Sequence, residues 1–314
     1  MSRWTTNDIP PQRGRSVVVT GTGGLGFQDA LALARAGAEV IIAGRNPSKG
    51  AAAVAAIRKE VPNADVCFEV VDLASLSSVA AFGERLRADR TSLDLLINNA
   101  AVMTPPRRKV TADGFELQFG TNYLGHFALT AQLLPLLRKG TQPRVVNVSS
   151  IAARNGRINF EDLQSNAGYR PLPVYSDSKL ASLMFALELQ RRSDAAGWGL
   201  TSIAAHPGIS RTDLVPNGAG RFSIFGLVRT LLWFLFQPAA QGALPTLFAA
   251  TSPQARAGAY YGPDKLNETR GYPTVAKIPQ QALDVEAARQ LWDVSAKLTG
   301  ASFPTMPREL SRAS

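Results

Sequence analysis

The 314-residue chain has the composition of a folded globular protein, because 45% of its residues are hydrophobic and 18% are charged; a disordered chain is excluded. Its formal net charge of +10 comes from scattered basic residues. No nucleic-acid reading motif accompanies them, so no nucleic-acid partner is expected, and a basic bias suits an anionic cofactor. A single cysteine, Cys67, and two histidines exclude a disulfide framework and argue against any metal site.

The start of the chain has no apolar segment of the signal-peptide kind, and the longest wholly apolar run, at 231–236, is too short to span a bilayer. We therefore expect a cytoplasmic protein without a transmembrane segment. Residues 1–314 are expected to form one domain, with an N-terminal extension at 1–14 and a flexible tail at 302–314.

Apolar runs typical of strands alternate with helical patterns along the chain. This alternation predicts βαβ units and an α/β fold, a doubly wound parallel sheet with helices on both faces. The runs are continuously apolar, as in strands that are covered on both sides. Strands are expected at 16–20, 38–43, 65–71, 93–97, 144–148 and 199–205, and helices at 75–87, 114–137 and 174–192 and at two earlier segments ending at 35 and 59. Asp113 is expected to cap the helix that begins at 114, with Glu116 three residues on.

The stretch Thr20-Gly21-Thr22-Gly23-Gly24-Leu25-Gly26 lies between the first predicted strand and the first predicted helix. It contains G-x-G-x-x-G, which alone is weak evidence, since tight turns use glycine anyway. In this position, however, backbone amides at the helix start can bind a pyrophosphate at the positive end of the helix dipole. The loop therefore predicts a nucleotide site.

Tyr175 and Lys179 are four residues apart in a helical pattern, so they share one face. An ammonium near the phenol would favour the phenolate form of the tyrosine. A solvated helix face is the alternative interpretation of the pair alone. Ser149 and Ser150 follow the strand at 144–148 and are expected at a carboxyl end of the sheet, where ligands of open α/β sheets bind.

Taken in order, the glycine loop, "LINNAA", "TNYLGHF", "RVVNVSS", "VYSDSKLAS" and "AAHPGISRTDL" resemble the short-chain dehydrogenase/reductase family over nearly the whole chain. "INFEDLQ" and "AYYGPD" are most similar to its retinol-dehydrogenase-like and protochlorophyllide-reductase-like branch. The resemblance implies a single Rossmann-type sheet and four catalytic residues, Asn122, Ser150, Tyr175 and Lys179, with Ser149 a structural neighbour. In the implied mechanism Tyr175 exchanges a proton with the substrate oxygen, Ser150 binds that oxygen, and Asn122 holds a water that connects Lys179 to solvent.

The resemblance also implies a set of cofactor-binding positions. Besides Tyr175 and Lys179, these are Gly21, Thr22, Gly24, Leu25 and Gly26 in the glycine loop, Asp72 and Leu73 near adenine, Asn99, Ala100 and Ala101 near the ribose, and Pro207, Gly208, Ile209 and Thr212 near the carboxamide and phosphates.

Two departures from the family pattern stand out. The glycine loop is one residue shorter than the family's T-G-x-x-x-G-x-G, and Ala101 replaces a family glycine. Asp72 has an alternative role as a helix cap. His126 and His206 are interpreted as packed structural residues.

The end of the second predicted strand indicates the choice of cofactor. NAD enzymes usually place Asp or Glu there to bind the ribose hydroxyls, whereas this chain has Gly44 followed by Arg45. A guanidinium can bind a 2′-phosphate, Asn46 adds a neutral donor, and Lys49 adds more distant positive charge. The predicted cofactor is NADP(H).

The sequence thus predicts an NADP(H)-dependent oxidoreductase that interconverts a ketone or aldehyde and an alcohol. Reduction of a conjugated C=C bond and a non-catalytic nucleotide-binding scaffold are the alternatives, and a homodimer is left open. The segment 209–238 is expected to be a loop and helix that cover the substrate. Apolar side chains at helical spacing favour a bulky apolar substrate, with a buried core helix or shallow membrane contact as alternatives: Phe222, Phe225, Leu232, Trp233 and Phe236.

Overall fold

A computed structural model describes residues 3–210 and 237–304 of the chain. Its centre is an eight-stranded sheet in the order β3-β2-β1-β4-β5-β6-β7-β8, parallel except for β8. The strands are β1 (Ser16–Thr20), β2 (Glu39–Gly44), β3 (Val66–Val70), β4 (Leu95–Asn98), β5 (Arg144–Val148), β6 (Thr201–Ala205), β7 (Tyr260–Lys265) and β8 (Arg270–Val275). The six strands expected from the sequence are confirmed, and the predicted doubly wound α/β fold with them.

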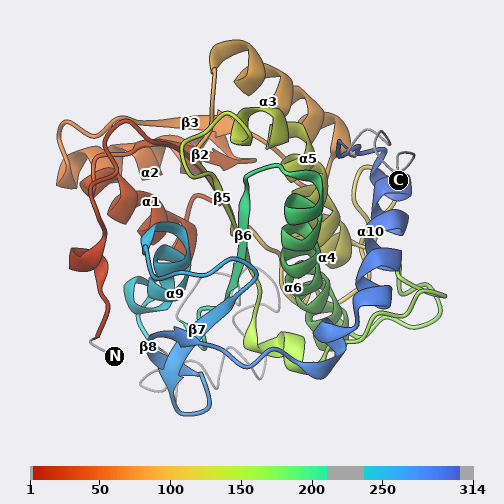
Figure 1. Cartoon of the computed structure of the whole chain (residues 1–314). Coiled ribbons are helices and arrows are strands. Elements are labelled where there is room, and N and C mark those ends of the chain that lie inside the picture. Colours follow the sequence, from red (N-terminus) through yellow and green to blue (C-terminus); the bar gives the residue numbers. More distant parts are fainter. Residues whose placement is uncertain (1–2, 211–236, 305–314) are drawn as a thin grey trace, which may run out of the picture.

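Helices cover both faces of this sheet (Figure 1). One face is covered by α1 (Gly24–Arg35), α2 (Pro47–Glu60) and α9 (Ala239–Thr251); the other by α3 (Leu76–Asp89), α5 (Gly125–Leu137), α6 (Pro171–Ala196) and α10 (Val285–Thr299). Successive strand residues point to opposite faces, so Val18 packs in one core and Val17 and Val19 in the other. Two-sided burial is the reason that these strands are continuously apolar.

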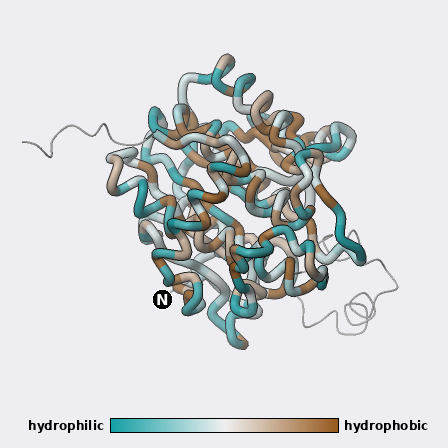
Figure 2. Tube along the Cα trace, turned by 90° about the vertical axis from the view of Figure 1, so that its right-hand side faces the viewer, coloured by the Kyte–Doolittle hydropathy of each residue, from teal (hydrophilic) through white to brown (hydrophobic). Residues whose placement is uncertain are grey.

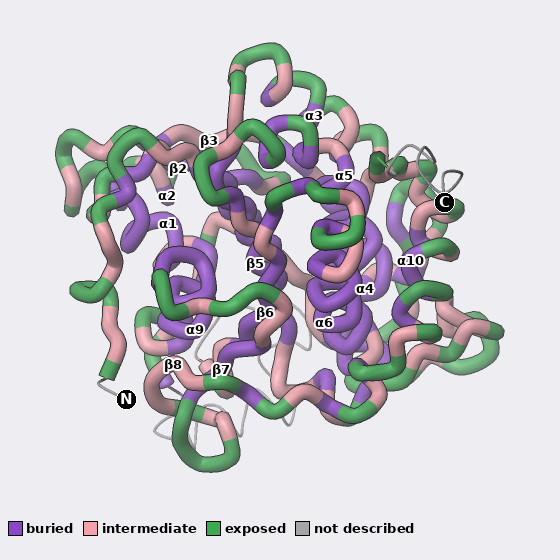
Figure 3. Tube along the Cα trace, viewed as in Figure 1, coloured by how far each residue is buried: buried purple, intermediate pink, exposed green. Residues whose placement is uncertain are grey.

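Burial and hydropathy follow the same layers. The strands and the sides of the helices that face them are buried, whereas the peripheral turns are exposed (Figure 3). The same turns carry most of the hydrophilic residues (Figure 2). Within residues 3–210 and 237–304, no helix combines the length and the apolarity needed to cross a membrane.

The hairpin of β7 and β8 was not predicted. Pro263 and Pro273 face each other across it, and proline breaks the alternation by which strands are recognised in a sequence. In this hairpin β7 pairs with β6 in parallel. The turn from β7 to β8 therefore lies at the edge of the sheet where the other parallel strands have their carboxyl ends.

The helix predicted at 114–137 begins later than expected and is not uniform. Glu116 caps it, because its carboxylate accepts hydrogen bonds from the amides of Gln118 at 2.9 Å and Phe119 at 2.7 Å. The expectation that Asp113 caps this helix is wrong: its carboxylate accepts from the amide of Leu76, at the start of α3. One turn of α4 (Leu117–Phe119) leads into a π-helical turn, Gly120–Leu124, and then into α5.

An aromatic cluster fixes α10 against α5 and α6. The ring of Trp292 lies 5.0 Å from Phe127, 5.6 Å from Phe185 and 4.4 Å from Phe303, measured between centroids. The Arg192 guanidinium, from α6, also lies over the Trp292 ring, 4.4 Å from its centre. The outer face of the two long helices is therefore covered by the chain's own last described helix.

We predict that Trp292→Ala lowers the free energy of unfolding by about 3–5 kcal/mol, because it removes a buried aromatic side chain that several rings contact. Urea unfolding measures the change. Gln290→Ala is the matched control, since Gln290 is exposed on the same helix. Equal stability of the two variants would contradict this account of how α10 is held.

Candidate active site

The glycine loop closes tightly over Asn99, the first residue after β4. Gly21 has a φ of 104°, and a Cβ there would lie 2.8 Å from Nδ2 of Asn99. A Cβ at Gly26 would lie 2.6 Å from the same atom. The side-chain amide of Asn99 in turn donates from Nδ2 to the carbonyl of Thr20 at 2.8 Å. Both glycines are required because the backbone approaches this side chain so closely.

The start of α1 fits a pyrophosphate despite the shortened loop. Its N-cap, Gly23, is extended, and no side chain caps the helix. The first-turn amides therefore keep their donor capacity at the positive end of the helix dipole, which is the arrangement that binds anions. Gly24, with a φ of 55°, and Leu25 complete this turn, so the chain's own backbone can hold the diphosphate of a dinucleotide.

The end of β2 lies against this loop. A Cβ at Gly44 would be 3.0 Å from Cγ2 of Thr22, so a carboxylate side chain at position 44 would crowd the loop. Arg45 is exposed. The side-chain oxygen of Asn46 caps α2 by accepting from the amide of Lys49 at 3.0 Å. Arg45 thus directly follows a residue that packs against the loop, and the Asn46 oxygen has a structural role.

The positions expected from the sequence near adenine and ribose lie before α3 and after β4. The carboxylate of Asp72 accepts from the amide of Ala74 at 3.0 Å, whereas Ser75 is the residue that caps α3; the alternative interpretation of Asp72 as the cap is wrong. Leu73 is buried. Ala101 is not among the described residues with positive φ, so alanine fits there without backbone strain.

Thr20 joins the glycine loop to the helix that carries Asn122. Its hydroxyl oxygen accepts from the amides of Asn99 at 2.9 Å and Ala100 at 3.0 Å, and it lies 2.9 Å from Nε2 of His126. Nδ1 of His126 faces the carbonyl of Asn122 at 2.9 Å. A carbonyl only accepts, so Nδ1 carries the proton, and in the neutral ring Nε2 accepts from Thr20. Only the four-residue spacing of Asn122 and His126 could have indicated this link from the sequence.

Asn122 lies within the π-helical turn and is fully engaged. Its side chain accepts from the amide of Val102 at 2.7 Å and donates to the Val102 carbonyl at 2.9 Å. It also donates to the hydroxyl of Ser178 on α6 at 3.0 Å. Such turns are frequent at functional sites. Asn122 thus ties the segment after β4 to the helix that carries Tyr175.

Tyr175 and Lys179 are both buried on α6, one turn apart. Nζ of Lys179 lies 6.0 Å from the centre of the Tyr175 ring and donates to the carbonyl of Val148, the last residue of β5, at 2.9 Å. The hydroxyl of Ser149 donates to the Lys179 carbonyl at 2.7 Å, which confirms its structural role. Ser150 caps a short 3-10 helix, Ile151–Asn155, and is half-buried.

Burial dominates the electrostatics of these groups. It raises the pKa of Tyr175 to about 12, partly offset by an interaction with the Ser150 side chain, and lowers the pKa of Lys179 to about 8. The Lys179 ammonium, held by the Val148 carbonyl, is not among the causes of the Tyr175 shift, contrary to the sequence-based expectation. The phenol is therefore protonated at neutral pH, as a proton donor must be.

The loop after β6 completes this edge of the sheet. Pro207 accepts from the side chain of Gln237 at 2.6 Å, Gly208 has a φ of 63°, and Ile209 is exposed. Ser210 forms a bridge with Gln237, so the chain leaves and returns at one place. Thr212 and most of the expected substrate-covering segment, including its apolar helix face, lie outside the described residues.

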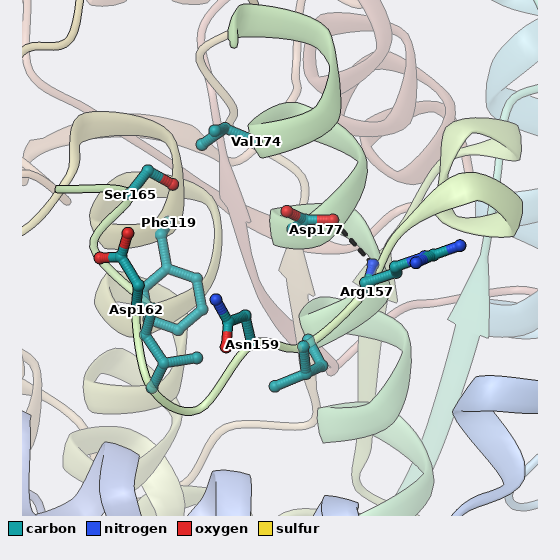
Figure 4. Close-up of a pocket in the computed structure, with 9 residues that line it drawn as sticks. Phe119, Arg157, Asn159, Asp162, Ser165, Val174 and Asp177 are labelled. Carbon is teal, nitrogen blue, oxygen red and sulfur yellow. Dashed lines mark hydrogen bonds between the residues drawn. The ribbon is translucent and has the colours of Figure 1, made fainter. Parts of the chain in front are cut away.

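A cavity of about 20 Å³ lies beside α6, lined by Phe119, Val174, Asp177 and the segment between the 3-10 helix and α6 (Figure 4). It has room for about one water. Asp177 accepts from the amide of Arg157 at 2.7 Å, and Asp162 accepts from the amides of Asn166 and Ala167. These carboxylates hold the segment that leads from Ser150 to Tyr175.

The anion-binding helix start and the buried tyrosine and lysine at the carboxyl edge define a nucleotide-dependent oxidoreductase. The comparison with known proteins gives the same class. A family model described as short chain dehydrogenase matches residues 15–219. The chain belongs to the short-chain dehydrogenase family, whose members use a nicotinamide cofactor on a small-molecule substrate.

Curated relatives cover most of the chain. Human polyprenol dehydrogenase is 39% identical over 93% of this chain and 87% of its own length, and mouse retinol dehydrogenase 13 is 40% identical over 91% and 84%. The crystal structure of an uncharacterised protein from Mycobacterium paratuberculosis is 40% identical, with a TM-score of 0.80, over 96% of this chain and 100% of that one.

We predict a pH dependence that the variant His126→Gln lacks. Burial lowers the pKa of His126 from 6.5 to about 4, so between these values the unfolded chain binds more protons than the folded one. The corresponding free energy of unfolding is fully present above about pH 6.5 and is lost as the pH falls towards 4, by roughly 3 kcal/mol. Urea unfolding between about pH 7 and pH 4 measures it, with His206 unchanged in both proteins. If the free energy of unfolding of the two proteins changed with pH in parallel, His126 would not be the source of this pH dependence.

Proposed function

We propose that the protein is an NADP(H)-dependent oxidoreductase that interconverts a ketone or aldehyde and an alcohol. The observation that carries this proposal is the buried Tyr175, protonated beside Ser150, at the sheet edge where the glycine loop and Lys179 also lie. The proposed catalytic residues are Asn122, Ser150, Tyr175 and Lys179. A bound nicotinamide cofactor supplies or accepts the hydride.

The proton is handled by the chain's own side chains. In the reductive direction the Tyr175 hydroxyl donates its proton to the substrate oxygen, which the hydroxyl of Ser150 also binds. The Lys179 ammonium is held by the Val148 carbonyl at 2.9 Å and lies 6.0 Å from the centre of the Tyr175 ring; we assign to it the cofactor-binding role expected from the sequence. The sequence assigned Asn122 a water that connects Lys179 to solvent. Its side chain is bound instead by Val102 and Ser178, so we propose that it positions α6 and the segment after β4.

The substrate is proposed to be bulky and apolar. Relatives at about this distance are named polyprenol dehydrogenase and retinol dehydrogenase, and both names denote long apolar alcohols. The apolar side chains predicted from the sequence to cover the substrate, in the segment 209–238, support the same class.

Reduction of a conjugated C=C bond has less support. Cys67, the one cysteine of the chain, lies on β3. Four strand spacings, roughly 19 Å, separate β3 from β5. The thiol is therefore remote from Tyr175 and is no alternative proton donor. A complete set of Asn122, Ser150, Tyr175 and Lys179, of which all but Ser150 are buried, also disfavours a scaffold without turnover.

We predict that Tyr175→Phe lowers turnover roughly 10²-fold or more, because it removes the proton donor without changing the volume of the side chain. Cofactor affinity and the unfolding midpoint should stay near wild type. Steady-state turnover with the best substrate and a fluorescence titration with NADPH measure the two effects. Tyr272→Phe, on the edge strand β8, is the matched control. Near-normal turnover of Tyr175→Phe would show that the proton comes from elsewhere.

We predict that the wild type prefers NADPH over NADH by roughly ten- to a hundredfold, as expected for one charge-assisted contact to the 2′-phosphate worth about 1.5–3 kcal/mol. Arg45→Ala should abolish this preference. The comparison of kcat/KM for both cofactors decides it, with Lys59→Ala, in the last turn of the helix α2 that follows Arg45, as control. Equal use of the cofactors by the wild type, or an unchanged preference in Arg45→Ala, is the contrary outcome.

A further inference from the structure

The tip of the β7–β8 hairpin brings a partly buried carboxylate, Glu268, to the carboxyl edge of the sheet. Its Oε2 forms an ion pair with Nη2 of Arg154 at 2.7 Å and lies 3.0 Å from Nε2 of His206. Its Oε1 accepts from the amide of Lys277 at 2.9 Å. Both oxygens are therefore bound, and only 16% of the side chain is exposed.

His206 is neutral and donates to this carboxylate. The amide of Gly208 donates to Nδ1 at 3.2 Å, so the remaining proton of the neutral ring is on Nε2, which faces Glu268. The imidazole fills the space above Gly262 on β7, where any Cβ would overlap it. Burial would raise the pKa of Glu268, but bonds from His206 and the Lys277 amide and the charge of Arg154 lower it to about 2. The carboxylate is charged at any working pH.

The backbone that presents Glu268 is in an unusual conformation. Leu266, Asn267 and Glu268 have φ values of 48°, 54° and 66°, in the left-handed region that side-chain-bearing residues rarely occupy. Such a run persists where surrounding contacts hold it, and it is found preferentially at functional sites. Here Arg154 also donates to the Asn267 carbonyl at 3.2 Å. In this conformation the Glu268 side chain points toward Arg154 and His206.

The partners of this hairpin belong to two loops of the candidate active site. Arg154 lies on the 3-10 helix that Ser150 begins. The amide of Ile209, after β6, donates to the carbonyl of Thr269 at 2.8 Å. The hydroxyl of Tyr260 donates to the Ser150 carbonyl at 3.3 Å, and its ring lies 5.0 Å from that of His206. One carboxylate thus contacts both the serine loop and the loop after β6.

We propose that Glu268 is a positioning residue of the active site: through Arg154 and His206 it fixes the separation between the serine loop and the loop Pro207–Ile209. This separation sets how the substrate oxygen bound by Ser150 is aligned with the cofactor. The inference rests on the proposed function, because the loops acquire catalytic meaning from it. Glu268 itself touches neither substrate nor cofactor.

Glu268→Gln is the test, because it removes the charge and keeps the volume. We expect kcat to fall roughly ten- to a hundredfold, since a displacement of about 1 Å in the reacting groups is enough for such a loss. KM for NADPH should stay near wild type, because the glycine loop and Arg45, at β1 and β2, would hold most of the cofactor, whereas the loop Pro207–Ile209 would align its nicotinamide end. Glu286→Gln, an 82% exposed carboxylate on α10, is the matched control and should behave as wild type.

Arg154→Met provides a second and independent variant. It should lower kcat by a similar factor, and the double variant should be no slower than the slower single variant, because both changes break one contact. If Glu268→Gln does not fold, the kcat of Arg154→Met alone tests the positioning role, and an unchanged kcat in that variant would overturn it. Losses that multiply in the double variant would overturn the proposal.

The outcomes for the two proposals are distinguishable. Wild-type turnover of carbonyl or alcohol substrates together with unchanged kcat in Glu268→Gln overturns the positioning role and leaves the proposed function intact. A wild type that binds NADPH but turns over no such substrate overturns the proposed function, and the positioning role falls with it. A kcat loss at constant KM for NADPH, absent from the control, supports both.

Discussion

The hydroxyl of Thr20 joins the two halves of the candidate active site. It accepts from the amides of Asn99 and Ala100 and contacts the ring of His126, which binds the carbonyl of Asn122. The end of β1, the start of the segment after β4 and the π-helical turn therefore have one fixed arrangement. The close packing of the glycines on Asn99 depends on it, because the same threonine holds that asparagine.

The helix α6 receives this arrangement through Asn122, which donates to Ser178 between Tyr175 and Lys179. The end of β5 also holds α6 by two hydrogen bonds. The Lys179 ammonium donates to the Val148 carbonyl, and the Ser149 hydroxyl donates to the Lys179 carbonyl. Burial of an ammonium is costly unless it is hydrogen-bonded. The strand end that binds the ammonium therefore also determines where the phenol lies.

The sequence predicted the fold wherever one physical pattern was sufficient. Strands buried on both faces are continuously apolar, so six of them and their helices were found. The β7–β8 hairpin was missed because Pro263 and Pro273 interrupt it. The start of the helix before α5 was misplaced because a cap at Asp113 and one at Glu116 look alike in a sequence. Only the structure shows that the Asp113 carboxylate binds Leu76 instead.

For the candidate site, the sequence located the residues but not their connections. Motif spacing placed Tyr175 and Lys179 on one helix face, yet it did not reveal that burial rather than the ammonium controls the pKa of the phenol. His126 was expected to be structural, and the structure adds what it joins. Glu268 gave no signal, because its partners Arg154 and His206 are distant along the chain and its backbone conformation has no sequence pattern.

In the proposed reaction, hydride moves between a cofactor at the glycine loop and a carbonyl carbon beside Tyr175. The most direct measurement is the fate of deuterium from NADPH labelled at the nicotinamide C4, with a long-chain conjugated enal as substrate. Mass spectrometry and NMR of the product locate the label. The account predicts an allylic alcohol with deuterium on the carbinol carbon and the double bond intact. Deuterium on the β-carbon of a saturated aldehyde would contradict it.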